Sequence, residues 1–230
     1  MSAVRFGAFQ PGAHDVEIEH AFARADDPAW GAEAVRGIRR RGHTPLVTVE
    51  PWTWPTDADL LAWGTVLGGG FPFVRFGHEP NLAPGHSYPW GSDPERYRRE
   101  WARFRAAVPG ARLVWCMNIS YPGSRPMADY WPGAESVDVL GIDGYAWNGE
   151  PPAAVFRPSL AELRAFAPDK PAMVCETAFP AGKGQAAWAR KLAGIAVAER
   201  IGAVVWFSQR KEMDWTLSAA ARRAFARAVA

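Results

Sequence analysis

Short apolar runs alternate with longer amphipathic stretches along the whole chain. Each run is rich in Val and aromatic residues and is bounded by turn residues, which is typical of short buried strands. Seven strands are predicted in this way, over residues 4–9, 46–50, 74–78, 113–118, 139–143, 172–176 and 203–207. An eighth strand is needed between residues 10 and 28, and residues 18–24 are the candidate.

The stretches between these runs carry helix signals. Asp93 can cap a helix that has Pro94 at its first position. Apolar residues then recur at helical spacing, namely Tyr97, Trp101, Phe104 and Val108. Further stripes with this spacing are Trp30, Ala34, Val35 and Ile38; Leu160, Leu163 and Phe166; and Trp188, Leu192 and Ile195.

Repeated strand–helix units without a break in composition predict a single (β/α)8 TIM barrel over residues 1–230. An open doubly wound sheet is the alternative. Only about seven residues separate Phe9 from Ile18, whereas a parallel crossover normally needs a dozen or more. We therefore expect a shortened first unit, with its helix reduced to a turn.

Charge and composition exclude several classes of partner. The chain has 26 Lys and Arg against 24 Asp and Glu, and its only basic block is Arg39-Arg40-Arg41. We therefore expect no nucleic-acid partner. No window approaches the ~18 apolar residues of a membrane span, and the start of the chain lacks a signal-peptide layout. Cys116 and Cys175 lie inside apolar runs, which leaves little room for a disulfide framework or a metal cage.

Aromatic residues are abundant, with 12 Trp, 12 Phe and 5 Tyr. Many adjoin Pro, Gly or acidic residues, a setting in which flat rings can stack on the C–H faces of sugars. These are Trp52, Trp54, Tyr88, Trp90, Trp131, Trp147 and Trp215. Four others fall in helical patterns and are expected in the core: Trp30, Trp63, Trp101 and Trp188.

Polar residues stand where most of the predicted strands end. Active sites of such barrels form at the carboxyl ends of the strands, so these residues are the functional candidates. They are Glu50, His78, Glu79, Asn118, Asp143, Tyr145, Glu176, Ser208 and Gln209. Glu79 and Glu176 would face each other across the barrel mouth, which fits the two carboxyls of glycoside hydrolysis. A structural ion pair is the alternative reading of such carboxylates.

Longer motifs surround these residues, in order from residue 45 to residue 217. They are Arg75-Phe-Gly-His78-Glu79-Pro-Asn81, Tyr88-Pro-Trp90-Gly91, Leu113-Val-Trp115 with Asn118, Tyr130-Trp-Pro-Gly133, Val137-Asp-Val-Leu-Gly-Ile-Asp143-Gly-Tyr145, Lys170-Pro-Ala-Met-Val-Cys-Glu176-Thr177, Trp188, Val205-Trp206-Phe207 and Asp214-Trp215. Together they resemble glycoside hydrolase family 26, a clan A barrel family dominated by β-mannanases.

The resemblance implies a retaining mechanism with Glu79 as acid/base and Glu176 as nucleophile. It also implies that Tyr145 donates to Glu176 and that Arg75 supplies positive charge beneath it. His78 would contact Glu79 or the sugar beside it. Substrate contacts are expected from Trp206 as the floor of the subsite, from Trp90, Trp147 and Trp215 around the mouth, and from Asn118, Glu50 and Asn81.

The expected activity is internal cleavage of a β-linked polysaccharide, with β-mannan as the leading substrate. β-1,3-Xylan and mixed-linkage β-glucan are alternatives within the class, and a glycan-binding barrel with weak or lost catalysis is an alternative outside it. We expect a monomer that binds polysaccharide or oligosaccharide and needs no cofactor or metal. A polysaccharide substrate suggests an extracellular location. A dehydrogenase or kinase is disfavoured because Gly68-Gly69-Gly70 precedes a strand instead of opening a helix.

Overall fold

The computed structural model describes residues 4–10 and 15–230. Within these residues, eight parallel strands form one closed barrel in sequence order, with β8 pairing back to β1. The strands are β1 (Arg5–Phe9), β2 (Ile18–Arg24), β3 (Thr44–Glu50), β4 (Phe73–Phe76), β5 (Arg112–Asn118), β6 (Val139–Asp143), β7 (Ala172–Thr177) and β8 (Ile201–Phe207). The TIM barrel prediction is confirmed, and the open sheet is wrong.

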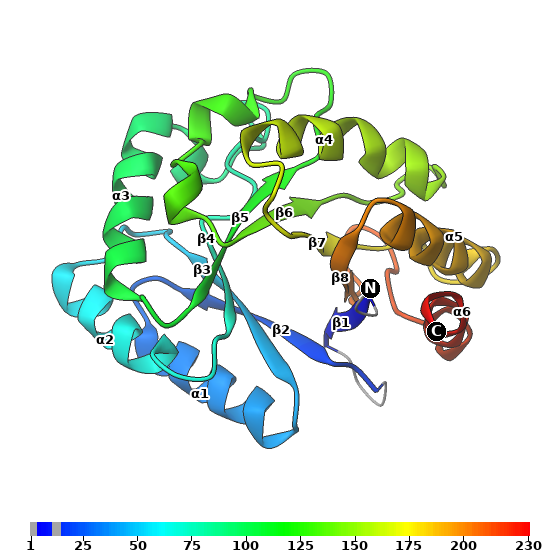
Figure 1. The fold of residues 1–230 in the computed structure, drawn as a ribbon, viewed down its shortest axis with the longest axis horizontal. Coiled ribbons are helices and arrows are strands. Elements are labelled where there is room, and N and C mark those ends of the chain that lie inside the picture. The colour runs from blue at the N-terminus through cyan, green and yellow to red at the C-terminus, as the bar shows by residue number, and fades with distance from the viewer. Residues whose placement is uncertain (1–3, 11–14) are drawn as a thin grey trace.

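Helices cover the outside of this barrel (Figure 1). The α-helices found in the described residues are α1 (Pro28–Arg40), α2 (Asp57–Leu67), α3 (Pro94–Ala107), α4 (Pro152–Phe166), α5 (Gln185–Ala198) and α6 (Ala219–Val229). Short 3-10 helices η1 (Pro89–Gly91), η2 (Met127–Tyr130) and η3 (Ala134–Ser136) lie in the loops. Asp93 caps α3 as predicted, because its carboxylate accepts from the Arg96 amide at 2.9 Å. No helix of the described residues is long and apolar enough to cross a bilayer.

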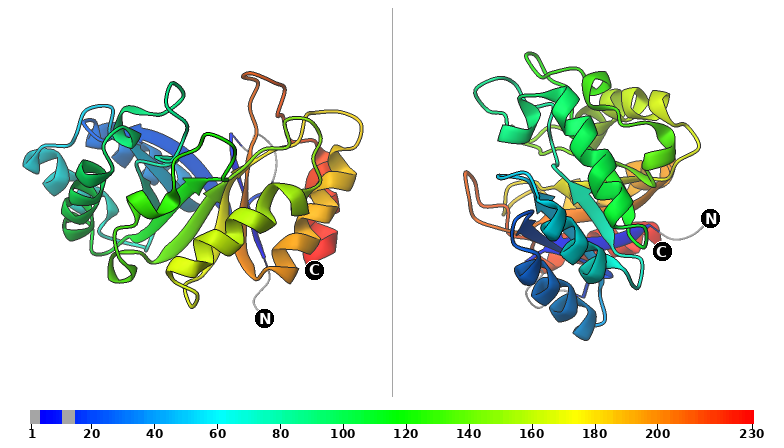
Figure 2. Two further views of the ribbon diagram at one scale, coloured as in Figure 1. Left: turned by 90° about the horizontal axis from the view of Figure 1, so that it is seen from above. Right: turned by 90° about the vertical axis from the view of Figure 1, so that its left-hand side faces the viewer.

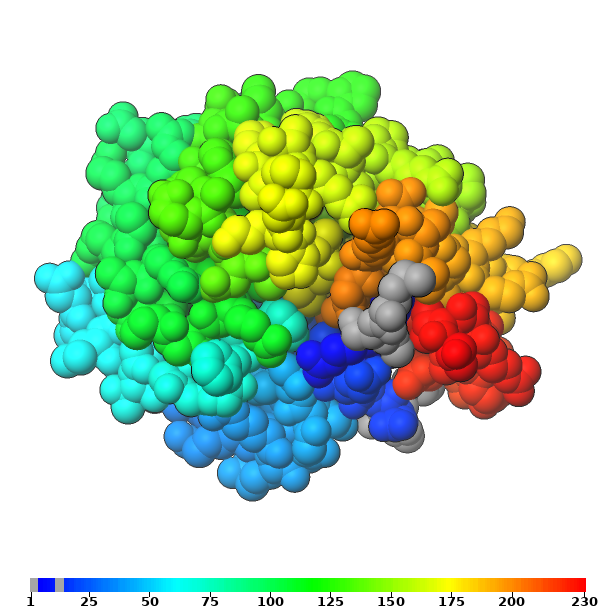
Figure 3. Space-filling view, in the orientation of Figure 1, coloured from blue at the N-terminus to red at the C-terminus, as the bar shows by residue number. Residues whose placement is uncertain are grey.

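The first unit of the barrel is shortened. β1 and β2 pair directly, with Phe9 opposite His20, and the described parts of their connection contain no helix. The expected turn falls on residues 11–14, which lie outside the described residues. α6 packs beside β1, with the rings of Phe6 and Phe225 4.8 Å apart (Figures 1 and 3).

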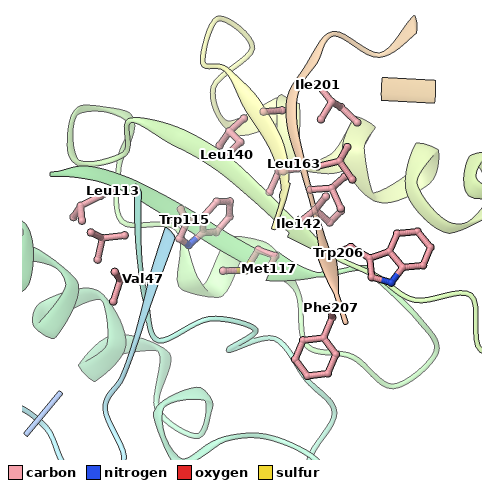
Figure 4. Packing of buried hydrophobic residues seen from close by; sticks show 14 of the residues in the cluster. Val47, Leu113, Trp115, Met117, Leu140, Ile142, Leu163, Ile201, Trp206 and Phe207 are labelled. Atoms are coloured by element: carbon pink, nitrogen blue, oxygen red, sulfur yellow. The ribbon is translucent and has the colours of Figure 1, made fainter. Parts of the chain in front are cut away.

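Two apolar regions hold the barrel together. A small cluster inside the barrel is formed by alternate strand residues such as Val114, Cys116 and Val205. A larger one lies between the barrel and its helices and contains Trp63 and Trp101. Trp115, Leu163 and Trp206 of this cluster are labelled in Figure 4. The core prediction is wrong for Trp30, whose side chain is 49% exposed on α1. The neighbouring β1–β2 connection offers no described helix to cover it.

The carboxyl ends of the strands all meet at one end of the barrel, because every pair of neighbours is parallel. In the left-hand view of Figure 2, the orange loop that follows β8 rises from this end, opposite to the end where β1 begins. The polar strand ends of the sequence are therefore gathered at a single mouth.

Close packing between α1 and α2 gives a stability test. A β-carbon added at Gly31 would overlap the Trp63 ring, which is fully buried. Gly31→Ala should therefore lower the free energy of unfolding, measured with urea, by about 1–3 kcal/mol. Gly194→Ala is the matched control, because nothing lies within 4 Å of a β-carbon there in α5. This control should raise stability by about 0.5–1 kcal/mol, and equal effects at both sites would contradict the packing.

Candidate active site

A cavity of about 500 Å³ opens at the carboxyl ends of the strands. It has the size and position typical of a ligand site in this fold. Its walls combine carboxyl groups with aromatic rings. The lining residues are Phe9, Phe22, Glu50, His78, Glu79, Leu82, His86, Tyr88, Asn118, Ile119, Tyr145, Trp147, Glu176, Phe207, Gln209, Lys211, Glu212 and Trp215.

Glu176 is held by two donors from different strands. The Tyr145 hydroxyl donates to its Oε2 at 2.6 Å, and an Arg75 Nη2–H donates to its Oε1. Both contacts stabilise negative charge on the carboxylate. The expected contacts of Tyr145 and Arg75 with Glu176 are therefore present.

A β-bulge brings Glu176 to the cavity. Ile142 of β6 is opposite Val174, but Asp143 is opposite Glu176, so β7 has one extra residue at Cys175. In a regular strand, Glu176 would point away from the side on which Cys175 lies. The bulge allows both residues to face the inside of the barrel.

Glu79 lies in a strained turn after β4. Its backbone has φ +49°, a left-handed conformation that is uncommon for a non-glycine residue and costs of order 1–3 kcal/mol. Gly77, two residues earlier, also has positive φ and packs against the rings of Trp90 and Tyr97. The Glu79 amide donates to the Cys116 carbonyl oxygen at 3.0 Å, which ties the turn to β5.

An amide pair positions the Glu79 carboxyl. The Asn118 side chain donates to Glu79 Oε1 at 2.8 Å. The Asn81 side chain binds the backbone of Asn118. Its Oδ1 accepts from the Asn118 backbone amide, and its Nδ2 donates to the Asn118 carbonyl oxygen, both at 2.9 Å. Asn81 is fully buried and does not line the cavity, so its prediction as a substrate contact is wrong. It supports Asn118 instead.

The buried carboxyls differ in their electrostatic surroundings. Burial raises the pKa of Glu79 well above its ordinary value, and the charges of Asp143 and Glu176 act in the same direction. Burial also raises the pKa of Asp143 to about 7, although the Arg75 cation opposes this rise. Glu79 forms no ion pair with Arg75, unlike Asp143 and Glu176, so no paired cation offsets the effect of burial on its pKa.

Arg75 links the strands beneath the cavity and is completely buried. Its Nε donates to Thr48 Oγ1 at 2.8 Å, and its Nη1 donates to Asp143 Oδ2 at 2.6 Å. The His20 Nε2 lies 3.0 Å from Nη2. Arginine can only donate, so His20 accepts there and carries its proton on Nδ1. Burial lowers the pKa of His20 well below its ordinary value, which agrees with a neutral ring.

His78 also lines the cavity as a neutral side chain. Burial lowers the pKa of its imidazole well below the ordinary value. The ring packs near Phe22, Tyr88 and Trp90, with centroid separations of 5.8, 4.9 and 5.8 Å. Within the described residues its buried Nδ1 has no hydrogen-bond partner, so the structure shows no hydrogen bond from this atom to Glu79.

Two predicted aromatic contacts are wrong. Trp90 is fully buried and donates its indole N–H to the His78 carbonyl oxygen at 2.8 Å, while Tyr88 stacks over it and faces the cavity. Trp206 points outward to Trp188 of α5, so the neighbouring Phe207 lines the cavity instead (Figure 4). Trp147 and Trp215 both line the cavity as predicted, with ring centroids 5.0 Å apart.

Sequence reasoning missed the phenylalanine wall and the inner polar layer. Phe9, Phe22 and Phe207 line one side of the cavity and contact one another. His20 and Thr48 lie below it on β2 and β3. Both residues alternate with apolar residues along their strands, a pattern that could have indicated inward-facing positions. The prediction instead rested on the polar residues at the ends of β4 and β7.

One cluster has potential metal ligands. The ligand atoms of Cys116, Asp143 and Cys175 lie within 4.8 Å of one another. Burial raises the pKa of the Cys116 thiol well above its ordinary value, and Arg75 already donates to Asp143. A protonated thiol and a neighbouring cation both disfavour a dication at this cluster.

No protein-family profile matches the chain. Endoglucanase H from Acetivibrio thermocellus is 26% identical over 243 residues, which takes in 88% of this chain and 26% of that protein. This chain therefore spans only about a quarter of that curated relative.

Solved structures give a closer match in fold. A family 26 β-mannanase from Bacteroides ovatus superposes with a TM-score of 0.68 at 14% identity, covering 98% of this chain and 88% of that one. This chain resembles the family 26 glycoside hydrolases. The fold also matches a family 128 endo-β-1,3-glucanase from Amycolatopsis mediterranei, with a TM-score of 0.65 at 15% identity over 99% of this chain and 100% of that one.

The raised pKa of Glu79 predicts a pH-dependent cost to stability. The folded protein releases this proton at higher pH than the unfolded chain, so stability falls as pH rises from the ordinary Glu value through the raised one. Glu79→Gln removes the charge, and its free energy of unfolding relative to the unsubstituted protein should grow from pH 5 to pH 9. Urea titrations at both pH values measure this difference.

The control for this experiment is Glu33→Gln, an exposed position on α1. It should leave the stability difference between pH 5 and pH 9 nearly unchanged. The same pH-independent change for both variants would show that Glu79 is not a buried acid with a raised pKa.

Proposed function

We propose that the chain is a retaining, endo-acting glycoside hydrolase of a β-linked polysaccharide, with Glu79 as acid/base and Glu176 as nucleophile. One observation carries the proposal. Two of the carboxyls that line one cavity differ in their surroundings: burial raises the pKa of Glu79, whereas Glu176 is paired with the Arg75 cation. A carboxylic acid and a carboxylate at one site are what double displacement requires.

In the first step, the Glu176 carboxylate attacks the anomeric carbon and forms a glycosyl ester. Glu79 gives its proton to the glycosidic oxygen, which leaves as an alcohol. Tyr145 and Arg75 keep the nucleophile in one orientation, since both of its oxygens accept hydrogen bonds.

In the second step, water attacks the anomeric carbon and Glu79 takes the proton from that water. The ester bond to Glu176 breaks, and the configuration of the sugar is restored by two inversions. Asn118 keeps Glu79 in reach of both the leaving oxygen and the water through its 2.8 Å hydrogen bond.

β-Mannan is the leading substrate, because motifs and fold both resemble family 26 β-mannanases. β-1,3-Glucan is the second candidate. The family 128 endo-β-1,3-glucanase, described in complex with laminaripentaose, is matched over its whole length, so the two chains are similar in length. The curated relative, an endoglucanase, is compatible with a glucan as well. A panel of mannan, β-1,3-xylan, laminarin and mixed-linkage β-glucan separates these substrates by the reducing ends released.

Substitution of either glutamate tests the mechanism and separates an enzyme from a glycan-binding barrel. Glu79→Ala should lower turnover by about 10²–10⁴-fold, and Glu176→Ala by several orders of magnitude, since each removes a group that the transition state requires. Azide should rescue the Glu176 variant and give a glycosyl azide of inverted configuration. Proton NMR of the unsubstituted reaction should show first release of the retained anomer.

Glu50→Gln is the matched control, because Glu50 is a cavity carboxyl without a role in bond breaking. It should lose much less turnover than either catalytic variant. Near-normal turnover of the Glu79 or Glu176 variant, or first release of the inverted anomer, would defeat the mechanism. Oligosaccharide binding without any hydrolysis would favour the binding-barrel alternative.

A further inference from the structure

Trp52 lies directly after β3, at the edge of the cavity. Its side chain is 45% exposed, and its indole N–H donates to Glu50 Oε2 at 3.2 Å. Glu50 lines the cavity, whereas Trp52 does not. The indole therefore continues the cavity wall outward on the β3 side.

Neighbouring rings hold this indole in place. Trp52 packs edge-to-face on Tyr88 and Trp90, with centroid separations of 5.8 and 5.3 Å and interplanar angles of 85° and 78°. Tyr88 in turn lies flat on the buried Trp90 at 4.4 Å. A half-exposed aromatic side chain with fixed orientation loses little conformational entropy when a ligand stacks on it.

Glu50 adds a polar group to the same corner. Burial raises the pKa of this carboxyl, and the only hydrogen bond to it among the described residues comes from Trp52. Its remaining acceptor positions are free for hydroxyl groups. An apolar ring face beside a hydrogen-bond acceptor matches a pyranose, which presents C–H groups on its faces and hydroxyls at its edge.

We infer that Trp52 and Glu50 form a subsite for one further sugar of the glycan chain whose neighbouring sugar occupies the cavity. The inference rests on the proposed function. Trp147, 46% exposed on the loop after β6, offers a second platform three strands away around the barrel. A chain that extends from Trp52 across the cavity to Trp147 is bound on both sides of the cleaved bond, as internal cleavage requires.

Length-dependent kinetics test this subsite. Trp52→Ala should lower kcat/KM about tenfold on hexasaccharides and polymer, because a stacked sugar is lost. It should leave kcat/KM nearly unchanged on a short aryl glycoside that fills only the cavity. Trp52→Phe, which keeps an aromatic face, should recover most of the loss.

Trp30→Ala is the matched control, since Trp30 is 49% exposed on α1 and does not line the cavity. It should leave both substrate classes unchanged. Equal losses for Trp52→Ala on short and long substrates, or no difference from Trp30→Ala, would overturn the subsite while leaving the proposed function intact.

Calorimetric measurement of oligosaccharide binding tests the Trp52 subsite independently of hydrolysis. Mannohexaose and laminarihexaose are titrated into the Glu176→Ala protein, which should not cleave them, and into the same variants made in the Glu176→Ala background. If no glycan is hydrolysed, the proposed function fails, but weaker hexasaccharide binding by Trp52→Ala than by Trp30→Ala still supports the subsite. Absence of hexasaccharide binding by the Glu176→Ala protein would overturn the subsite and would also remove β-mannan and β-1,3-glucan as substrates.

Discussion

The site depends on the burial of one guanidinium group. Transfer of a bare ion into a protein interior carries an idealised cost of order 20 kcal/mol, so the group must be fully paired. All five N–H groups of Arg75 have an acceptor, from five different strands. The partners are His20 on β2, Thr48 on β3, Cys116 on β5, Asp143 on β6 and Glu176 on β7. The interior of the barrel is thereby fixed at the level of Glu176.

Two backbone irregularities then place the carboxyls. The β-bulge at Cys175 turns Glu176 toward Arg75, and the left-handed turn at Glu79 carries that carboxyl away from the cation. One carboxyl is consequently paired with positive charge, while the other is buried beside an amide. This difference in electrostatic surroundings arises from placement, since both residues are glutamates on the same barrel.

The architecture could be predicted well from the sequence, because a barrel of this kind depends on the periodicity of apolar residues and on the residues that end each strand. Even the strand at 18–24 and the Tyr145–Glu176 contact are as expected. The aromatic residues that line the cavity were predicted less well. At the end of a strand, strand register and loop packing decide whether a side chain faces the cavity or the surrounding helices. Trp206 faces α5 and Trp90 lies beneath Tyr88, and neither placement follows from the local sequence.

Trapping of the glycosyl ester tests the central claim most directly. Activated 2-deoxy-2-fluoro-β-mannoside and 2-deoxy-2-fluoro-β-glucoside slow the second step, so the ester accumulates and can be located by peptide mass spectrometry. The account predicts one fluorosugar per chain, attached to Glu176. Tyr145→Phe should form the same ester at a lower rate. Attachment to Glu79, Glu50 or Asp143, or turnover of these substrates without an ester, would contradict it.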